Sequence, residues 1–67
     1  MADIETTVQD KMTYYVITSA EPTELFAWTR QFYKDFPPRT YNSNITGPTF
    51  KSGKWILRAV RFTEQLM

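Results

Sequence analysis

The sequence contains no cysteine, no histidine and only two glycines. Without cysteine there are no disulfides and no thiolate metal sites, and without histidine the commonest transition-metal ligand and the usual catalytic base are missing. Two isolated glycines also exclude a glycine-rich phosphate-binding loop. Glu21 and Glu24 fit the first turn of a helix better than a catalytic pair of carboxylates. We therefore expect a protein that is not an enzyme and that binds neither a metal ion nor a cofactor.

Long apolar segments are missing as well. No run of residues approaches the ~20 apolar positions of a membrane-spanning helix. Residues 1–7 lack the basic start and the apolar stretch of a secretory signal. These absences predict a cytoplasmic protein with no membrane partner.

Charge of one sign does not dominate, but it is unevenly distributed along the chain. The formal net charge is +1, yet residues 1–35 contain three basic and six acidic residues, whereas residues 36–67 contain five basic residues and one acidic residue. Such an asymmetry between halves is a hint of an anionic partner for the second half.

Aromatic residues are abundant, at 16% of the chain. A domain of 67 residues buries only about 60% of the surface that its unfolded chain exposes, so its core is small. Chains this short usually depend on disulfides, a metal ion or a partner subunit. Because the composition excludes the first two, aromatic packing and self-association remain as sources of stability.

Local patterns predict a flexible tail at residues 1–10, which show no periodicity, and a single domain at residues 11–67. Residues 11–18 are rich in β-branched and aromatic side chains, a composition typical of a strand. Residues 55–62 carry the strongest strand pattern in the chain.

Between these strands, residues 22–35 predict a helix. Pro22 suits the first helical position, where its missing N–H would be unbonded in any residue. Pro37 ends the pattern, since the residue before a proline is pushed out of the α region. Leu25, Trp28, Thr29, Phe32 and Phe36 have the spacing of one helical stripe, and Phe26 and Tyr33 lie beside it, so the apolar arc is broad.

The second half of the chain predicts a β-hairpin with a three-residue loop that joins Phe50 to Lys54. This register places Ile45 opposite Ala59. Gly47-Pro48 predicts a bulge in the first strand of the hairpin, or a position for that strand at the edge of the sheet.

The order strand, helix, strand, strand predicts an α+β fold. The helix allows the second strand to run parallel to the first, and the third, most apolar strand then lies between them and antiparallel to both. We expect a three-stranded, antiparallel or mixed sheet with the third strand central and one helix packed on one face.

The strands at 11–18 and 55–62 are apolar on both faces, although one helix can cover only one face of a sheet. The second face could be covered by the tail through Ile4 and Val8, by the C-terminal Leu66-Met67, by a second copy of the chain or by a different protein. The pattern favours another chain, and a two-fold homodimer is the commonest symmetric form. The residues expected at this interface are Tyr15, Ile17, Ile56, Val60 and Phe62. A second candidate interface is the flank of the helix, with Phe26, Arg30 and Tyr33.

Basic and aromatic residues alternate in the second half of the chain, which indicates an alternative partner. Cationic side chains neutralise phosphates and aromatic rings stack on unpaired bases. The candidates for binding a nucleic acid are Arg39, Tyr41, Lys51, Lys54, Arg58 and Arg61. The sequence thus predicts a small non-catalytic interaction or regulatory protein, of the inhibitor, adaptor or assembly-factor type. We expect it to bind another macromolecule and to self-associate through its sheet, with nucleic-acid binding as the alternative.

Overall fold

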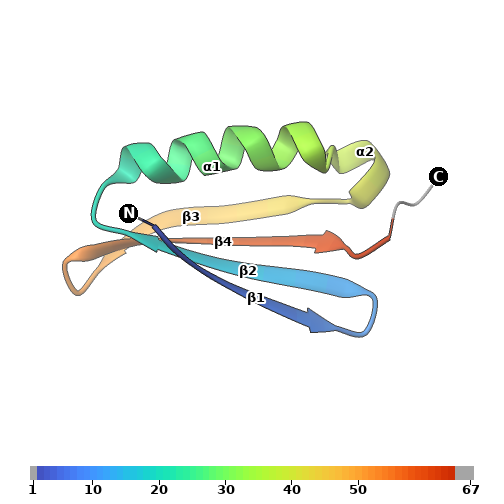
Figure 1. Ribbon diagram of the computed structural model, residues 1–67, viewed down its shortest axis with the longest axis horizontal. Helices are drawn as coiled ribbons and strands as arrows, with labels where there is room; N and C mark the ends of the chain where they lie inside the picture. Colours follow the sequence, from blue (N-terminus) through green and yellow to red (C-terminus); the bar gives the residue numbers. More distant parts are fainter. Residues whose placement is uncertain (1, 65–67) are drawn as a thin grey trace.

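The computed structural model describes residues 2–64 as one sheet with a long helix along one face (Figure 1). The elements in chain order are β1 (Asp3–Gln9), β2 (Met12–Ser19), α1 (Pro22–Asp35), α2 (Pro38–Tyr41), β3 (Asn44–Lys51) and β4 (Lys54–Phe62). Both helices lie on the same side of the sheet (Figure 1). The predicted α+β class, with a helix on one face of an antiparallel sheet, is confirmed.

The sheet has four strands in the order β1-β2-β4-β3, and every neighbouring pair is antiparallel. The predicted arrangement of β2, β4 and β3 is confirmed, with β4 between the other two. The prediction of three strands is wrong, because the expected tail at residues 1–10 contains β1. The prediction of one helix is also wrong, because the segment after Pro37 forms the short helix α2.

β1 forms a hairpin with β2 through the two residues Asp10 and Lys11, and Asp10 adopts a left-handed φ of 57°. The pairing runs without interruption from Asp3↔Thr18 to Gln9↔Met12. Every residue of β1 is exposed. Backbone hydrogen bonds rather than side-chain burial therefore hold this strand in place.

α1 begins at Pro22, as predicted, and its first turn is tied to the end of β2. Ser19 is buried, and its Oγ accepts a hydrogen bond from the backbone N–H of Glu21 at 3.1 Å and donates one to Glu24 Oε1 at 3.1 Å. Ser19 thus satisfies a backbone donor next to the helix start, where intrahelical acceptors are absent. At the other end the backbone N–H of Phe36 bonds Phe32 O at 2.8 Å.

The centre of the core lies between α1 and the face of the sheet that we call the inner face. Its fully buried members are Ile17 of β2, Leu57 of β4 and Leu25 of α1. Ile17 pairs directly with Leu57, so their side chains meet under the helix. The placement of Tyr15 and Ile17 with Ile56, Val60 and Phe62 at an open interface is therefore wrong, since Tyr15 and Ile17 point toward α1.

The hairpin of β3 and β4 has a two-residue turn, and the predicted three-residue loop is wrong. Lys51 pairs with Lys54, while Ser52 and Gly53 have positive φ values of 54° and 78°. Positive φ at both central residues is the type I′ geometry, which matches the twist of the strands. The register shifts between Thr46 and Thr49, as expected for Gly47-Pro48, and the shift restores the predicted pairing of Ile45 with Ala59.

Candidate functional site

The side of the sheet turned away from the helices, which we call the outer face, is apolar along its two central strands. Cross-strand neighbours on this face pair Met12 with Phe62, Tyr14 with Val60, and Thr18 with Ile56. Tyr14 is 42% exposed and the other five are partly buried. These six side chains, together with Val16 of the pair that lies between Tyr14↔Val60 and Thr18↔Ile56, present a surface that is mostly hydrocarbon and aromatic to solvent.

Charged side chains border and interrupt this surface. Arg58 is exposed and lies opposite Val16 of β2, and Val16 lies opposite Glu5 of β1. Asp3 occupies the same face of β1 at the next pair along, opposite Thr18. The outer face thus has an apolar centre with one cation inside it and two carboxylates along its β1 margin.

No segment within residues 2–64 covers the outer face. Both helices lie on the inner side, and the remaining segments are the strands and their short turns (Figure 1). Ile4 and Val8 pair with Ile17 and Thr13, so their side chains lie on the inner side of the sheet. The explanation in which the N-terminal residues fold over the open face is therefore wrong, and Leu66-Met67 lies outside the described residues.

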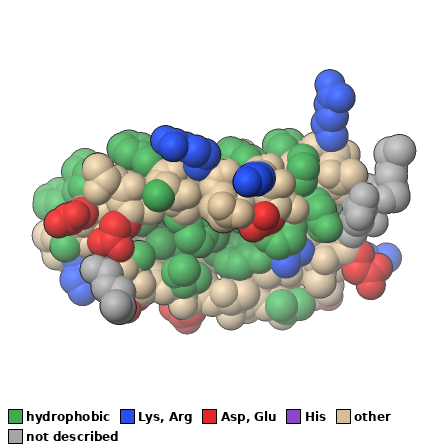
Figure 2. Space-filling view, turned by 45° about the horizontal axis from the view of Figure 1, so that its top comes forward, with side chains coloured by type: hydrophobic (Ala, Val, Ile, Leu, Met, Phe, Trp, Pro, Cys, Tyr) green, Lys and Arg blue, Asp and Glu red, His purple; other side chains and the backbone are tan. Residues whose placement is uncertain are grey.

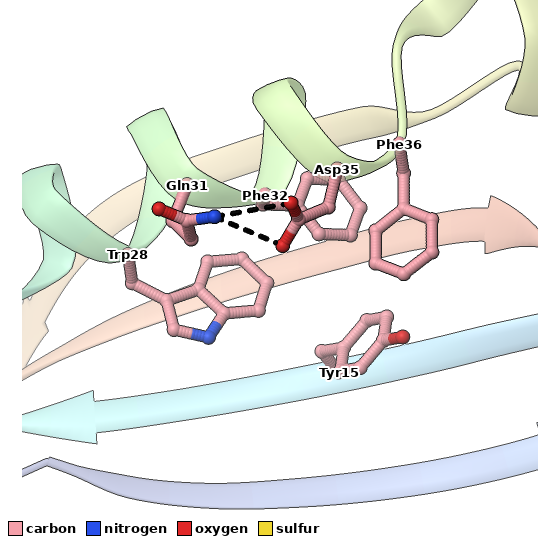
Figure 3. A pocket seen from close by; sticks show the side chains of 6 residues that line it. All are labelled: Tyr15, Trp28, Gln31, Phe32, Asp35 and Phe36. Atoms are coloured by element: carbon pink, nitrogen blue, oxygen red, sulfur yellow. Dashed lines mark hydrogen bonds between the residues drawn. The ribbon is translucent and has the colours of Figure 1, made fainter.

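A second apolar surface, which sequence reasoning missed, lies beside α1 on the side of β1. A groove with about 160 Å³ of free space runs there, and Figure 3 shows the side chains that line it: Tyr15, Trp28, Gln31, Phe32, Asp35 and Phe36. Gln31 Nε2 donates to both carboxylate oxygens of Asp35, at 3.0 and 3.1 Å, along the rim. Figure 2 shows hydrophobic side chains gathered along the middle of the molecule, between the helix and the strands below it.

The groove is continued toward the edge of the sheet by the inner side of β1. Thr6 pairs with Tyr15, and Ile4 and Val8 on either side of it are 53% and 63% exposed. α1 does not shield these two side chains, although they lie on the same face as the core. Their position follows only from the strand register, which explains why the sequence alone gave no indication of this surface.

The flank of the helix that was expected at an interface lies on the opposite side of α1 from Trp28. Phe26 is 54% exposed and Arg30 is exposed, one turn apart. Tyr33 is partly buried, with its ring 5.8 Å from that of Phe32. These residues form a narrow border along the β3 side of the helix.

Two of the nucleic-acid candidates are engaged inside the fold. The guanidinium of Arg61 lies 3.9 Å from the ring centre of Phe36 and 5.7 Å from that of Tyr41. Its Nε donates to Tyr15 Oη at 2.9 Å, and one terminal nitrogen donates to the backbone oxygens of Phe62 and Thr63, each at 3.0 Å. These contacts leave Arg61 and Tyr41 in a structural role that holds α2 against the end of β4.

The remaining basic candidates do not form one patch. Lys51 and Lys54 pair at the tip of the β3–β4 hairpin, whereas Arg39 lies on α2 at the opposite end of the long axis (Figure 1). Arg58 lies on the outer face between these ends. The structure therefore separates the residues that the sequence suggested as a single nucleic-acid surface.

Other kinds of site can be assessed only within residues 2–64. In that part of the chain no group of three or more carboxylates is placed to hold a metal ion, and no helix is long and apolar enough to cross a membrane. Comparison with protein-family models, with curated proteins and with solved structures finds no match.

Proposed function

We propose that this chain is a non-catalytic binding protein that docks another protein on the outer face of its sheet. The observation that supports the proposal is the apolar centre of that face, built by Met12, Tyr14, Ile56, Val60 and Phe62 and left uncovered by residues 2–64. A sheet with one solvated face ordinarily alternates between apolar and polar side chains. Contiguous apolar surface beyond a few hundred Å² on a soluble domain usually marks an interaction site.

A protein partner fits this face better than a nucleic acid does. Arg58 is the one cation among the central side chains, and Asp3 and Glu5 along the margin would repel phosphates. The aromatic Tyr14 and Phe62, surrounded by aliphatic residues, match the composition of the buried centre of protein interfaces. Arg58 would then fix the orientation of the partner by pairing with one of its acidic groups.

Substitutions on the outer face that keep the shape of the side chain test this proposal. Val16 and Val60 are both partly buried on the outer face, and valine to threonine preserves the β-branched form that strands favour. In affinity purification from the source cells, we expect a protein that the wild type retains to be lost by the Val16→Thr/Val60→Thr variant. The matched control is Thr23→Val in the exposed first turn of α1, which should retain the same protein.

Circular dichroism and urea unfolding establish that the variants are folded. Retention of the same set of proteins by all three forms would overturn the proposal. Binding of a single-stranded oligonucleotide at low salt that is lost in a Lys51→Glu/Lys54→Glu variant, and kept in the valine variant, would support the nucleic-acid alternative instead.

A further inference from the structure

The free edge of β1 carries backbone groups that have no partner in the sheet. The turn at Asp10 and Lys11 has two residues, so its closing pair Gln9↔Met12 is a hydrogen-bonded pair. Pairs alternate along an antiparallel ladder, which makes Asp3, Glu5, Thr7 and Gln9 the residues bonded to β2. The backbone N–H and C=O groups of Ile4, Thr6 and Val8 therefore point away from the sheet.

The two edges of the sheet differ in how well they are protected. β3 is interrupted by the register shift between Thr46 and Thr49 and contains Pro48, which has no N–H to donate. β1 contains neither proline nor lysine, and its seven pairs with β2 run without a shift. Soluble proteins normally blunt an exposed edge with such an interruption, with proline or with charged side chains. The charged side chains of β1 are Asp3 and Glu5, and both lie on the outer face rather than among the residues whose backbone groups point away from the sheet. β1 has neither an interruption nor a proline, so its backbone edge is available for pairing with another strand.

We propose that β1 pairs antiparallel with β1 of a second copy of this chain, with Thr6 opposite Thr6, to form a continuous eight-stranded sheet. In this register Ile4 faces Val8, Glu5 faces Thr7 and Asp3 faces Gln9 of the other copy. The three residues with free backbone groups then form three hydrogen-bonded pairs across the two-fold axis.

Charge and hydrogen bonding select this register over its neighbours. If the two-fold axis passed through Glu5, the two copies of Glu5 would lie directly opposite each other. If the axis passed through Ile4, Asp3 of each copy would lie opposite Glu5 of the other. Like charges in direct opposition destabilise a sheet. Centring on Thr7 would move Ile4 beyond the end of the partner strand and reduce the number of hydrogen-bonded pairs. The strand is self-complementary only when Thr6 is at the centre.

The side chains on the inner side of β1 support a second copy as the occupant. Ile4 and Val8 are 53% and 63% exposed, and the proposed register brings each of them beside the other residue type of the partner strand. Side chains that lie directly opposite each other on one face of an antiparallel pair are in contact range, and such cross-strand pairs stabilise a sheet. A two-fold axis perpendicular to the sheet also places both α1 helices on one side, so the grooves beside Tyr15 and Trp28 of the two copies face each other across β1.

The experiment is sedimentation velocity and light scattering over a wide concentration range, with variants of Thr6. We expect the wild type to have twice the 7.9 kDa mass of the chain. Thr6→Pro removes an N–H that the partner needs and that β2 does not, so it should give a monomer with an unchanged circular dichroism spectrum. Thr6→Val keeps the backbone donor and the branched shape, and it should remain a dimer.

Single cysteines test the register directly because the chain has none of its own. Directly opposed Cα atoms in a hydrogen-bonded pair lie about 5.5 Å apart, within the reach of a disulfide. The Thr6→Cys variant should therefore crosslink on mild oxidation, whereas Asp3→Cys, far from its own copy in this register, should not.

A wild type that remains monomeric at about millimolar concentration would overturn the proposal, since a dissociation constant weaker than about 1 mM is too weak for a specific dimer. A dimer that survives Thr6→Pro but is lost in the Val16→Thr/Val60→Thr variant would assign self-association to the outer face and would also overturn it. The proposal does not depend on the proposed function, because the edge and the outer face are separate surfaces.

Discussion

The guanidinium of Arg61 lies 3.9 Å above the centre of the Phe36 ring, which joins the end of β4 to the segment between α1 and α2. The same group donates to Tyr15 Oη at 2.9 Å. A planar cation can stack on one ring and bond a second residue in its own plane, which an ammonium group cannot do. Arg61 therefore connects three elements that are distant in sequence.

We expect Arg61→Lys to lower the free energy of unfolding by about 1–2 kcal/mol, because it loses the stacking contact and the fixed hydrogen-bond geometry. Urea unfolding followed by fluorescence measures this loss. Arg58→Lys on the same strand is the control: Arg58 is exposed, and the change should stay within about 0.5 kcal/mol. Equal effects of the two substitutions would contradict a structural role for Arg61.

Phe32 is the central ring of the core, stacked on Trp28 with centroids 4.9 Å apart and edge-on to Tyr15 at 5.6 Å. Replacing it with leucine should cost about 1–2 kcal/mol through lost aromatic contacts and an imperfectly filled volume. Phe26→Leu on the same helix, at a position that is 54% exposed, should change stability by less than about 0.5 kcal/mol. A large loss for Phe26→Leu would show that this residue is packed more tightly than its exposure indicates.

The two glycines differ in what surrounds them. Gly47 has a φ of +106°, and a Cβ at this position would lie 3.0 Å from the backbone oxygen of Ile56, whereas Gly53, with a φ of +78°, has nothing within 4 Å. We expect Gly53→Ala to cost about 1 kcal/mol from its left-handed conformation, and Gly47→Ala to cost at least about 2 kcal/mol because the close approach adds to it. Thermal unfolding of both variants checks the order, and the reverse order would contradict the crowding at Gly47.

Ser19 is buried and its Oγ takes part in two hydrogen bonds at the start of α1. Ser19→Ala would leave the backbone N–H of Glu21 without this acceptor, and we expect a loss of about 1–2 kcal/mol in the free energy of unfolding. Thr23→Ala in the exposed first turn of the helix is the matched control and should be nearly neutral. If both alanine variants unfold at the wild-type urea midpoint, the hydrogen bonds of Ser19 do not stabilise the start of α1.

The helix and the central strand were predictable because their signals are local. The helix at residues 22–35 has an apolar stripe, a proline at its start and two prolines after its end. The apolar periodicity and the positions of the prolines therefore predict the same helix boundaries. β4 is almost continuously apolar, which matches its position with a neighbour on each side. In these two elements the tertiary contacts and the local propensities of the residues favour the same secondary structure.

β1 and the faces of β2 were not predictable in the same way. All of β1 is exposed, so its composition carries no mark of burial, and its position depends on backbone pairing with β2. Alternation alone divides the side chains of β2 into two sets but does not say which set joins Ile56 and Val60. The register Ile17↔Leu57 decides this, and register is a property of two strands together.

The interruption of β3 by Gly47-Pro48 determines how far pairing through the sheet can extend. Because β3 is interrupted, β1 is the edge of the described sheet that has an unbroken row of free backbone groups. Two molecules joined through β1 use both of these rows and expose only β3 at either end. The proposed pairing would therefore give a finite assembly of two subunits rather than a fibre, since the edges left at its two ends are the interrupted ones.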